Sequence, residues 1–266
     1  MNKNTPNMLI RWIALLSILL NVAFNGLYIT LFPGLNIQEV SRSYHDLFTP
    51  AGYVFSIWGV IYLSFIIYGI VQLLPSNMKY RIYDRLAIPL IFSNILGSTW
   101  IIAFTNQYIL LSMIILVITL ALSIVMFFRS GKEVNLGVSS RWLWFPFSLF
   151  FGWISVAVIA NAAVTFKSFG WDGGVYGAEM WTIAMISIAG LFAIIVDAKF
   201  NNYIYAVVIV WASVGIWDER QADHPTIGIV ALISTTVMLL FVLGHALVRY
   251  LSTEAELQRE PEAKNI

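Results

Sequence analysis

Long apolar stretches separated by short polar turns run along almost the whole chain of 266 residues. A bilayer core about 30 Å thick needs roughly 20 residues of α-helix, because each residue rises about 1.5 Å. By this measure the pattern predicts transmembrane helices over 8–31, 50–74, 86–104, 108–128, 142–166, 179–196, 202–217 and 226–250. We therefore expect an all-α integral membrane protein, a bundle of about eight transmembrane helices.

Prolines and polar residues mark the ends of these spans. Pro33 and Gly34 are expected to end the first span, which is too long for a signal peptide and should stay uncleaved. Pro50 is expected in the first turn of the second span, where its missing N–H costs nothing. Residues 251–266 form a polar tail that we expect to be cytoplasmic and disordered.

Charge is scarce and lies outside the spans. Charged residues make up 11% of the chain, against roughly 25% in a soluble domain. The net charge of +1 gives no indication of a nucleic-acid partner. With the N-terminus inside, twelve Lys and Arg residues fall on the inner side and three, Arg42, Lys167 and Arg220, on the outer side. The positive-inside rule then places both termini in the cytoplasm.

The sequence shows no conventional set of catalytic residues and no conventional set of metal ligands. The chain contains no cysteine, which excludes disulfides, thiol catalysis and Cys-ligated metals. No Ser-His-carboxylate set and no His/Glu cluster with metal-ligand spacing can be assembled within the spans. An ion-coupled transporter usually needs charge at depth. We expect no enzyme activity, no metal and no cofactor, and we interpret His245 as a histidine at the headgroup interface.

Two of the ten tryptophans are expected deep in the membrane. Most of the others, such as Trp12, lie near span ends and fit an aromatic belt at the lipid interface. Trp58 lies roughly 12 Å below the outer end of its span, and Trp153 roughly 18 Å above the inner end of its own. Both depths fall in the outer half of the bilayer, where an indole N–H must find a partner.

Polar side chains gather near the same layer. They are Asn21, Asn25, Tyr62, Asn94, Ser98 and Asn161. Any single asparagine among them is readily explained as an interhelical hydrogen bond. The whole set, together with two deep tryptophans, favours an aromatic-walled pocket for a small ligand.

Three motifs occur in order in the second, third and fifth spans. The first runs from Phe48 to Tyr62 and contains Pro50, Gly52, Phe55 and Trp58; the second pairs Asn94 with Trp100; the third, within 141–164, contains Pro146, Trp153, Ala157 and Asn161. Together they resemble the tryptophan-rich sensory protein family, which is the family of the translocator protein or peripheral benzodiazepine receptor. The resemblance covers residues 9–166, and Phe147 departs from it, because the family usually shows Tyr after the proline.

The resemblance implies a five-helix bundle over residues 1–166, with three additional helices over 167–250 that resemble those of longer bacterial and algal members. The family binds porphyrins, sterols and aromatic drugs in a pocket closed by the loop between its first two helices. Carried over, this places Trp58, Tyr62, Asn94, Trp153, Ala157 and Asn161 at the pocket, with Tyr44 and His45 in the lid. Asn25 joins the set from its place in the polar layer.

We therefore expect a membrane ligand-binding or sensory protein, a receptor for a rigid hydrophobic molecule, with a tetrapyrrole such as porphyrin first and a sterol-like molecule second. The resemblance implies a bacterial cytoplasmic membrane. Association into a homodimer is a further possibility. The additional helices are expected to cover a face that shorter members use to dimerise. The alternatives are a transporter or permease for the same ligands, a porphyrin-degrading activity through redox-active tryptophans, and an assembly protein without a ligand.

Overall fold

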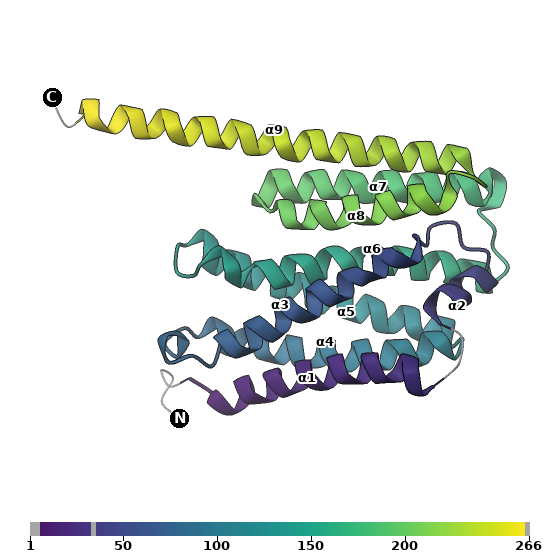
Figure 1. Cartoon of the computed structure of the whole chain (residues 1–266), viewed down its shortest axis with the longest axis horizontal. Coiled ribbons are helices and arrows are strands. Elements are labelled where there is room, and N and C mark those ends of the chain that lie inside the picture. Colours follow the sequence, from purple (N-terminus) through teal and green to yellow (C-terminus); the bar gives the residue numbers. More distant parts are fainter. Residues whose placement is uncertain (1–5, 33–35, 264–266) are drawn as a thin grey trace.

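The structure is a computed structural model that describes residues 6–32 and 36–263. In this described part, eight long helices run side by side in alternating directions, so that α1 begins and α9 ends at the same end of the bundle (Figure 1). The long helices are α1 (Met8–Leu31), α3 (Ile57–Val71), α4 (Ile82–Thr105), α5 (Ile109–Asn135), α6 (Phe145–Ser168), α7 (Gly177–Phe200), α8 (Tyr203–Arg220) and α9 (Pro225–Ala263). The predicted all-α membrane bundle is confirmed.

Seven of the predicted spans are long and apolar enough to cross a membrane within the described residues. The eighth, α8, is a helix of the bundle but does not meet that criterion. Its last turn carries Asp218, Glu219 and Arg220, which leaves a short apolar part. Because α8 packs against α6, α7 and α9, much of its surface is buried in protein and it needs less lipid-facing apolar surface than its neighbours.

The polar loop after the first span contains a short helix, α2 (Ile37–Ser43), that the apolar pattern did not predict. Asn36 and Glu39 form a reciprocal capping box at its start, each side chain accepting from the backbone N–H of the other. Pro33 and Gly34, expected to end the first span, lie outside the described residues. The helix α2 covers one end of the bundle, here called the α2 end.

Two boundaries differ from the prediction. Pro50 does not lie in the first turn of an α-helix, because the 3₁₀ turn η1 (Gly52–Ser56) comes between it and α3. The tail over residues 251–266 was expected to be disordered, but α9 continues to Ala263. This expectation was wrong because the tail is rich in Glu, Ala, Leu, Gln and Arg, which favour helix, and an existing helix extends without a new nucleation cost.

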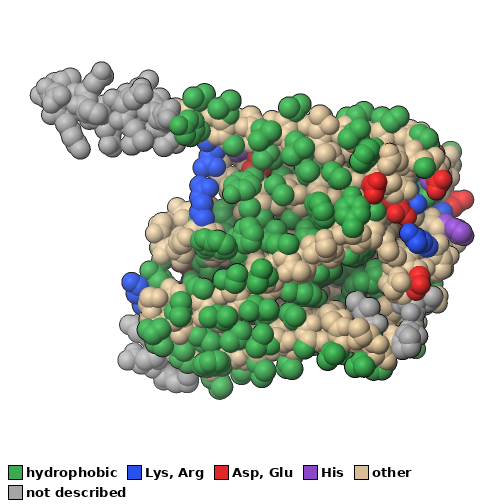
Figure 2. All heavy atoms as spheres, in the orientation of Figure 1, with side chains coloured by type: hydrophobic (Ala, Val, Ile, Leu, Met, Phe, Trp, Pro, Cys, Tyr) green, Lys and Arg blue, Asp and Glu red, His purple; other side chains and the backbone are tan. Residues whose placement is uncertain are grey.

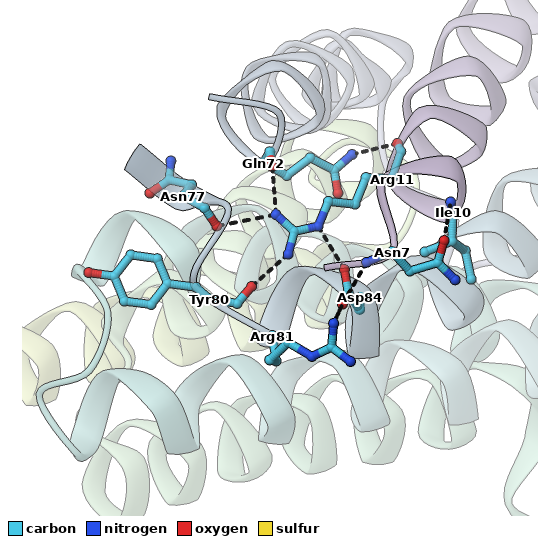
Figure 3. A network of polar contacts seen from close by, with 8 residues as sticks. All are labelled: Asn7, Ile10, Arg11, Gln72, Asn77, Tyr80, Arg81 and Asp84. Atoms are coloured by element: carbon cyan, nitrogen blue, oxygen red, sulfur yellow. Dashed lines mark hydrogen bonds and ion pairs between the residues drawn. The ribbon is translucent and has the colours of Figure 1, made fainter. Parts of the chain in front are cut away.

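The other end of the bundle, here called the Arg11 end, is closed by a buried arginine (Figure 3). Arg11 is fully buried, and its Nε donates to Asp84 Oδ1 at 2.7 Å. The terminal nitrogens donate to the backbone carbonyls of Gln72, Asn77 and Tyr80 at 2.9, 3.2 and 2.8 Å. One guanidinium therefore fastens α1 to the end of α3 and the start of α4.

His245 has a partner other than lipid headgroups. Its Nδ1 lies 3.0 Å from Oδ2 of the buried Asp197, and this contact ties α9 to α7. The interpretation of His245 as an interface histidine is therefore incomplete, because its partner comes from a distant part of the chain. Figure 2 shows hydrophobic side chains across the middle of the visible face, with charged side chains gathered at its two ends.

Candidate functional site: a cavity with a tryptophan wall

A cavity of about 530 Å³ lies between α1, α3, α4 and α6 and extends under α2. Toward the Arg11 end α1 approaches α3 closely, where Leu15 and Ile18 pack against Gly69. Toward the α2 end, polar contacts to α4 hold α1 instead, so that a space stays open beside α3. The volume falls within the roughly 300–1,000 Å³ that is typical of small-molecule pockets.

The structure brings all seven predicted pocket residues to this one cavity. They are Asn25, Trp58, Tyr62, Asn94, Trp153, Ala157 and Asn161. The helices α1, α3, α4 and α6 each contribute at least one of them, although they are distant in sequence. Sequence reasoning missed further aromatic wall residues, among them Phe55, Trp100 and Phe150. Trp100 already stood in the Asn94 motif, whereas nothing distinguished Phe150 from an ordinary core residue.

Aromatic rings form the wall that α3 and α6 share. Trp58 and Trp153 meet edge to face with ring centroids 6.4 Å apart, and Trp58 stacks on Tyr62 at 5.3 Å. Phe55 packs edge-on against Trp153 at 5.6 Å. Edge-to-face and offset-stacked contacts are the favoured arrangements of aromatic rings, so this wall is built in a low-energy geometry.

Three hydrogen-bond donors on this wall have no partner among the described residues. Trp153 is 2% exposed, yet no described residue accepts a hydrogen bond from its indole N–H. The indole N–H of Trp58 and the hydroxyl of Tyr62 likewise have no hydrogen-bond partner among the described residues. An unpaired donor in an apolar site is costly. A ligand that presents a carbonyl, carboxylate or ring nitrogen would satisfy it.

Most amide groups of the asparagines on the opposite wall form hydrogen bonds to other side chains of the protein. Asn21 donates to Asn94 Oδ1 at 3.3 Å, and Asn94 donates to Ser17 at 3.0 Å. The Asn21 carbonyl oxygen accepts from Ser98 at 2.8 Å and from Asn25 at 2.7 Å. This ladder fastens α1 to α4. Asn94 therefore lines the cavity while its amide acts as an interhelical link.

Asn161 positions another aromatic side chain. Its Oδ1 accepts from Trp100 Nε1 at 3.0 Å and from Ser112 at 3.1 Å, and its amide nitrogen donates to Thr165 at 3.3 Å. The Trp100 ring, held in this way, stacks on Phe104 with centroids 5.1 Å apart. Asn161 thus shapes the cavity through Trp100, and its own polar atoms are engaged.

The predicted lid residues lie next to the cavity and not on its wall. The cover is made by α2 residues Ile37, Gln38 and Ser41, which are among the lining residues, whereas Tyr44 and His45 are not. Both follow the end of α2: the Tyr44 hydroxyl donates to Gln107 at 3.4 Å, and His45 adopts a left-handed backbone conformation with φ of 50°. The inner face of α2 lines the cavity, whereas Tyr44 and His45 come after the end of this helix and lie beyond the cavity wall.

No three His, Cys, Asp or Glu side chains gather into a metal site in the part of the chain that the structure describes. The cavity wall contributes aromatic rings, amides and hydroxyls, with no Asp, Glu, Lys or Arg among its lining residues. Its surface is suited to shape and stacking and to a few directed hydrogen bonds.

Comparison with known proteins identifies one matching protein family. The family model described as TSPO-like protein matches residues 11–244. This match extends from α1 through α6, which all contribute residues to the cavity wall, and on through α7, α8 and the first half of α9, so the C-terminal helices are part of the family pattern. No curated protein and no solved structure matches the chain significantly.

Proposed function

Because the chain belongs to the TSPO-like protein family, we propose that it binds a rigid, hydrophobic molecule in the cavity under α2 and acts as a membrane sensory or ligand-binding protein. A tetrapyrrole such as porphyrin is the first ligand class, and a sterol-like molecule is the second. The observation that supports this most is the wall of Trp58, Tyr62 and Trp153, which offers ring faces for stacking and indole N–H groups for ligand acceptors.

Binding is favoured over transport by the closed Arg11 end. A permease would need a route from the cavity to the far side of the bundle. There, Arg11 is buried and hydrogen-bonded to groups from α3, the following turn and α4. Opening such a route would leave a buried charge unpaired, which is costly. The proposal is therefore binding and sensing without catalysis, in a site reached from the α2 end.

The same charges support an orientation. Lys and Arg residues predominate at the Arg11 end, including Arg81, Arg85, Arg129, Lys132, Arg141 and Lys199. By the positive-inside rule we place this end in the cytoplasm, and α2 on the outer face. We propose a bacterial cytoplasmic membrane as the location.

Tryptophan fluorescence tests the proposal, because two unpaired indoles lie on the cavity wall. Purified protein is titrated with protoporphyrin, with a sterol and with an unrelated hydrophobic compound of similar size. We expect saturable quenching by protoporphyrin at one molecule per chain. Equal, non-saturating quenching by all three compounds would contradict a specific site. Light- and oxygen-dependent loss of the porphyrin would indicate degradation instead of binding.

A further inference from the structure

The helix α8 holds the segment that forms one side of the cavity. Residues 46–55, here called the anchor segment, join α2 to α3 and contribute Thr49, Pro50, Gly52 and Phe55 to the cavity wall. We propose that α8 determines the ligand selectivity of the cavity by fixing the position of the anchor segment through Trp211, Gly215 and Arg220. This inference rests on the proposed function and assigns a role to the C-terminal helices.

Arg220 holds the first half of the anchor segment. Its Nε donates to the carbonyl of Leu47 at 3.1 Å, and one terminal nitrogen donates to the carbonyls of Asp46 at 2.8 Å and Thr49 at 3.5 Å. The Asp46 carboxylate in turn accepts from the backbone N–H groups of Phe48 and Thr49 at 3.0 and 2.8 Å. Charge-assisted hydrogen bonds of this kind are the stronger ones, and here they order residues 46–49, which have no regular secondary structure.

Trp211 and Gly215 hold the second half. Trp211 Nε1 donates to the carbonyl of Val54 at 2.9 Å, and the Gly215 carbonyl accepts from the N–H of Ala51 at 3.1 Å. The two backbones are so close that a Cβ atom at Gly215 would lie 2.1 Å from Val54 Cγ2 and 3.1 Å from Pro50 Cβ. Only glycine at position 215 permits this approach without moving the anchor segment.

The two faces of the anchor segment have different neighbours. Ala51 and Val54 contact α8. Val54 is fully buried, so its side chain cannot move into solvent when α8 comes closer. Gly52 and Phe55 face the cavity, and Phe55 packs on Trp153. Pressure from α8 on Val54 would therefore push the segment toward the cavity and the tryptophan wall. The cavity would narrow at this side and would exclude wide ligands before narrow ones.

Hydrogen exchange without ligand tests the positioning itself. Trp211→Phe keeps an aromatic ring beside Tyr53, with which Trp211 now packs edge-on at 5.6 Å, but removes the hydrogen bond to Val54. The backbone amides of the anchor segment should exchange about tenfold faster in this variant than in the wild type, as expected for the loss of one hydrogen bond. Unchanged exchange in the anchor segment would overturn the inference, whatever the variant does to ligand binding.

A pair of glycine variants tests selectivity. Gly215→Ala crowds α8 against the anchor segment, whereas Gly190→Ala crowds α7 against α9, where the added Cβ would lie 2.6 Å from Ser234 Oγ and no residue of the cavity wall is near. Both variants are titrated with protoporphyrin and with a smaller dipyrromethane. We expect Gly215→Ala to weaken protoporphyrin binding about tenfold and dipyrromethane binding less than twofold, while Gly190→Ala changes neither.

The outcomes separate the two claims. If Gly215→Ala and Gly190→Ala lower the affinities for both compounds in the same proportion, α8 only stabilises the bundle and the selectivity claim is wrong. If the wild type binds neither of these compounds nor the sterol, the proposed function is wrong. In that case the rate of hydrogen exchange in the anchor segment of Trp211→Phe still shows whether α8 fixes the position of this segment.

Discussion

Trp58 of α3 and Trp153 of α6 touch edge to face, with ring centroids 6.4 Å apart and ring planes at 86°. Two rings in this arrangement leave no slot between them for a third flat ring. A ligand in this cavity would therefore pack against both indoles from the cavity side and not between them. The pair acts as one wall of the site.

The Arg11 cluster predicts a large effect on stability from a single change. Asp84→Asn removes the carboxylate partner of a fully buried guanidinium, and we expect a loss of about 3 kcal/mol in the free energy of unfolding. Unfolding of purified protein by denaturant measures this loss. Ligand affinity should stay near the wild-type value, because none of the cluster residues lines the cavity.

Glu133→Gln is the matched control, because Glu133 pairs with Arg85 at 3.6 Å and the Arg85 side chain is 65% exposed. We expect a change of about 0–1 kcal/mol for this exposed pair. Similar losses for Asp84→Asn and Glu133→Gln would show that burial of Arg11 does not govern the stability of this end.

Asp46, which lies outside the membrane spans, predicts a pH dependence. Burial raises the pKa of the Asp46 carboxyl above its ordinary value of 3.8, because desolvation outweighs the hydrogen bonds from Thr49 and Phe48 and the charge of Arg220. The folded state thus holds this proton more tightly than the unfolded chain. The resulting stabilisation is complete below pH 3.8 and is lost as the pH rises through the pKa of the folded state.

Asp46→Asn removes this titration. The melting temperature of the wild type minus that of Asp46→Asn should therefore be greatest at acidic pH and should decrease toward neutral pH. Thermal unfolding of both proteins across this range measures the difference. An increase of the difference with rising pH would mean that the hydrogen bonds of Asp46 outweigh its burial.

Ligand should protect α2 if this helix is the lid. Its residues Ile37, Gln38 and Ser41 line the cavity, so an occupied cavity should slow hydrogen exchange over 36–49. The turn at 136–140, at the Arg11 end of α5, serves as the internal control and should not change. Equal exchange over 36–49 with and without saturating protoporphyrin would argue against a lid.

The orientation predicts which residues are reached from outside the cell. The chain lacks cysteine, so single cysteines can be introduced and labelled individually. A membrane-impermeant maleimide should label Gln107→Cys in intact cells and should label Lys199→Cys only after permeabilisation. A reporter fused after Glu254 should read as cytoplasmic. Outside labelling of Lys199→Cys would contradict the eight-crossing arrangement with both termini inside.

Much of the fold follows from apolar run lengths, because a bilayer imposes a span length that a sequence must meet. The first span was predicted to the residue as 8–31, which is the range of α1. The prediction failed where interactions between neighbouring residues determine the local structure. These places are the helix α2 with its capping box, the 3₁₀ turn before α3 and the helical tail of α9. The burial of Arg11 could not be predicted, because nothing in the sequence shows that distant carbonyls surround its side chain.

The site could be predicted in part. Depth estimates placed Trp58 and Trp153 in one layer, and the structure places both on one cavity. Depth does not give the direction of a side chain, so the sequence could not show that the two indoles are in direct contact. The role of α8 could not be foreseen, since it depends on contacts between residues such as Trp211 and Val54, 157 positions apart.

The most direct test compares protoporphyrin affinity across three proteins. Trp58→Ala removes part of the aromatic wall, and we expect binding to weaken about tenfold, since a stacking contact contributes about 0.5–1.5 kcal/mol beyond the buried area. Trp12→Ala removes a tryptophan that is 56% exposed and lies outside the cavity, and it should leave the affinity unchanged. Fluorescence titration of the wild type and both variants gives the values. A tenfold loss in Trp58→Ala alone is the predicted result, and equal affinities in all three proteins would contradict a ligand site at this cavity.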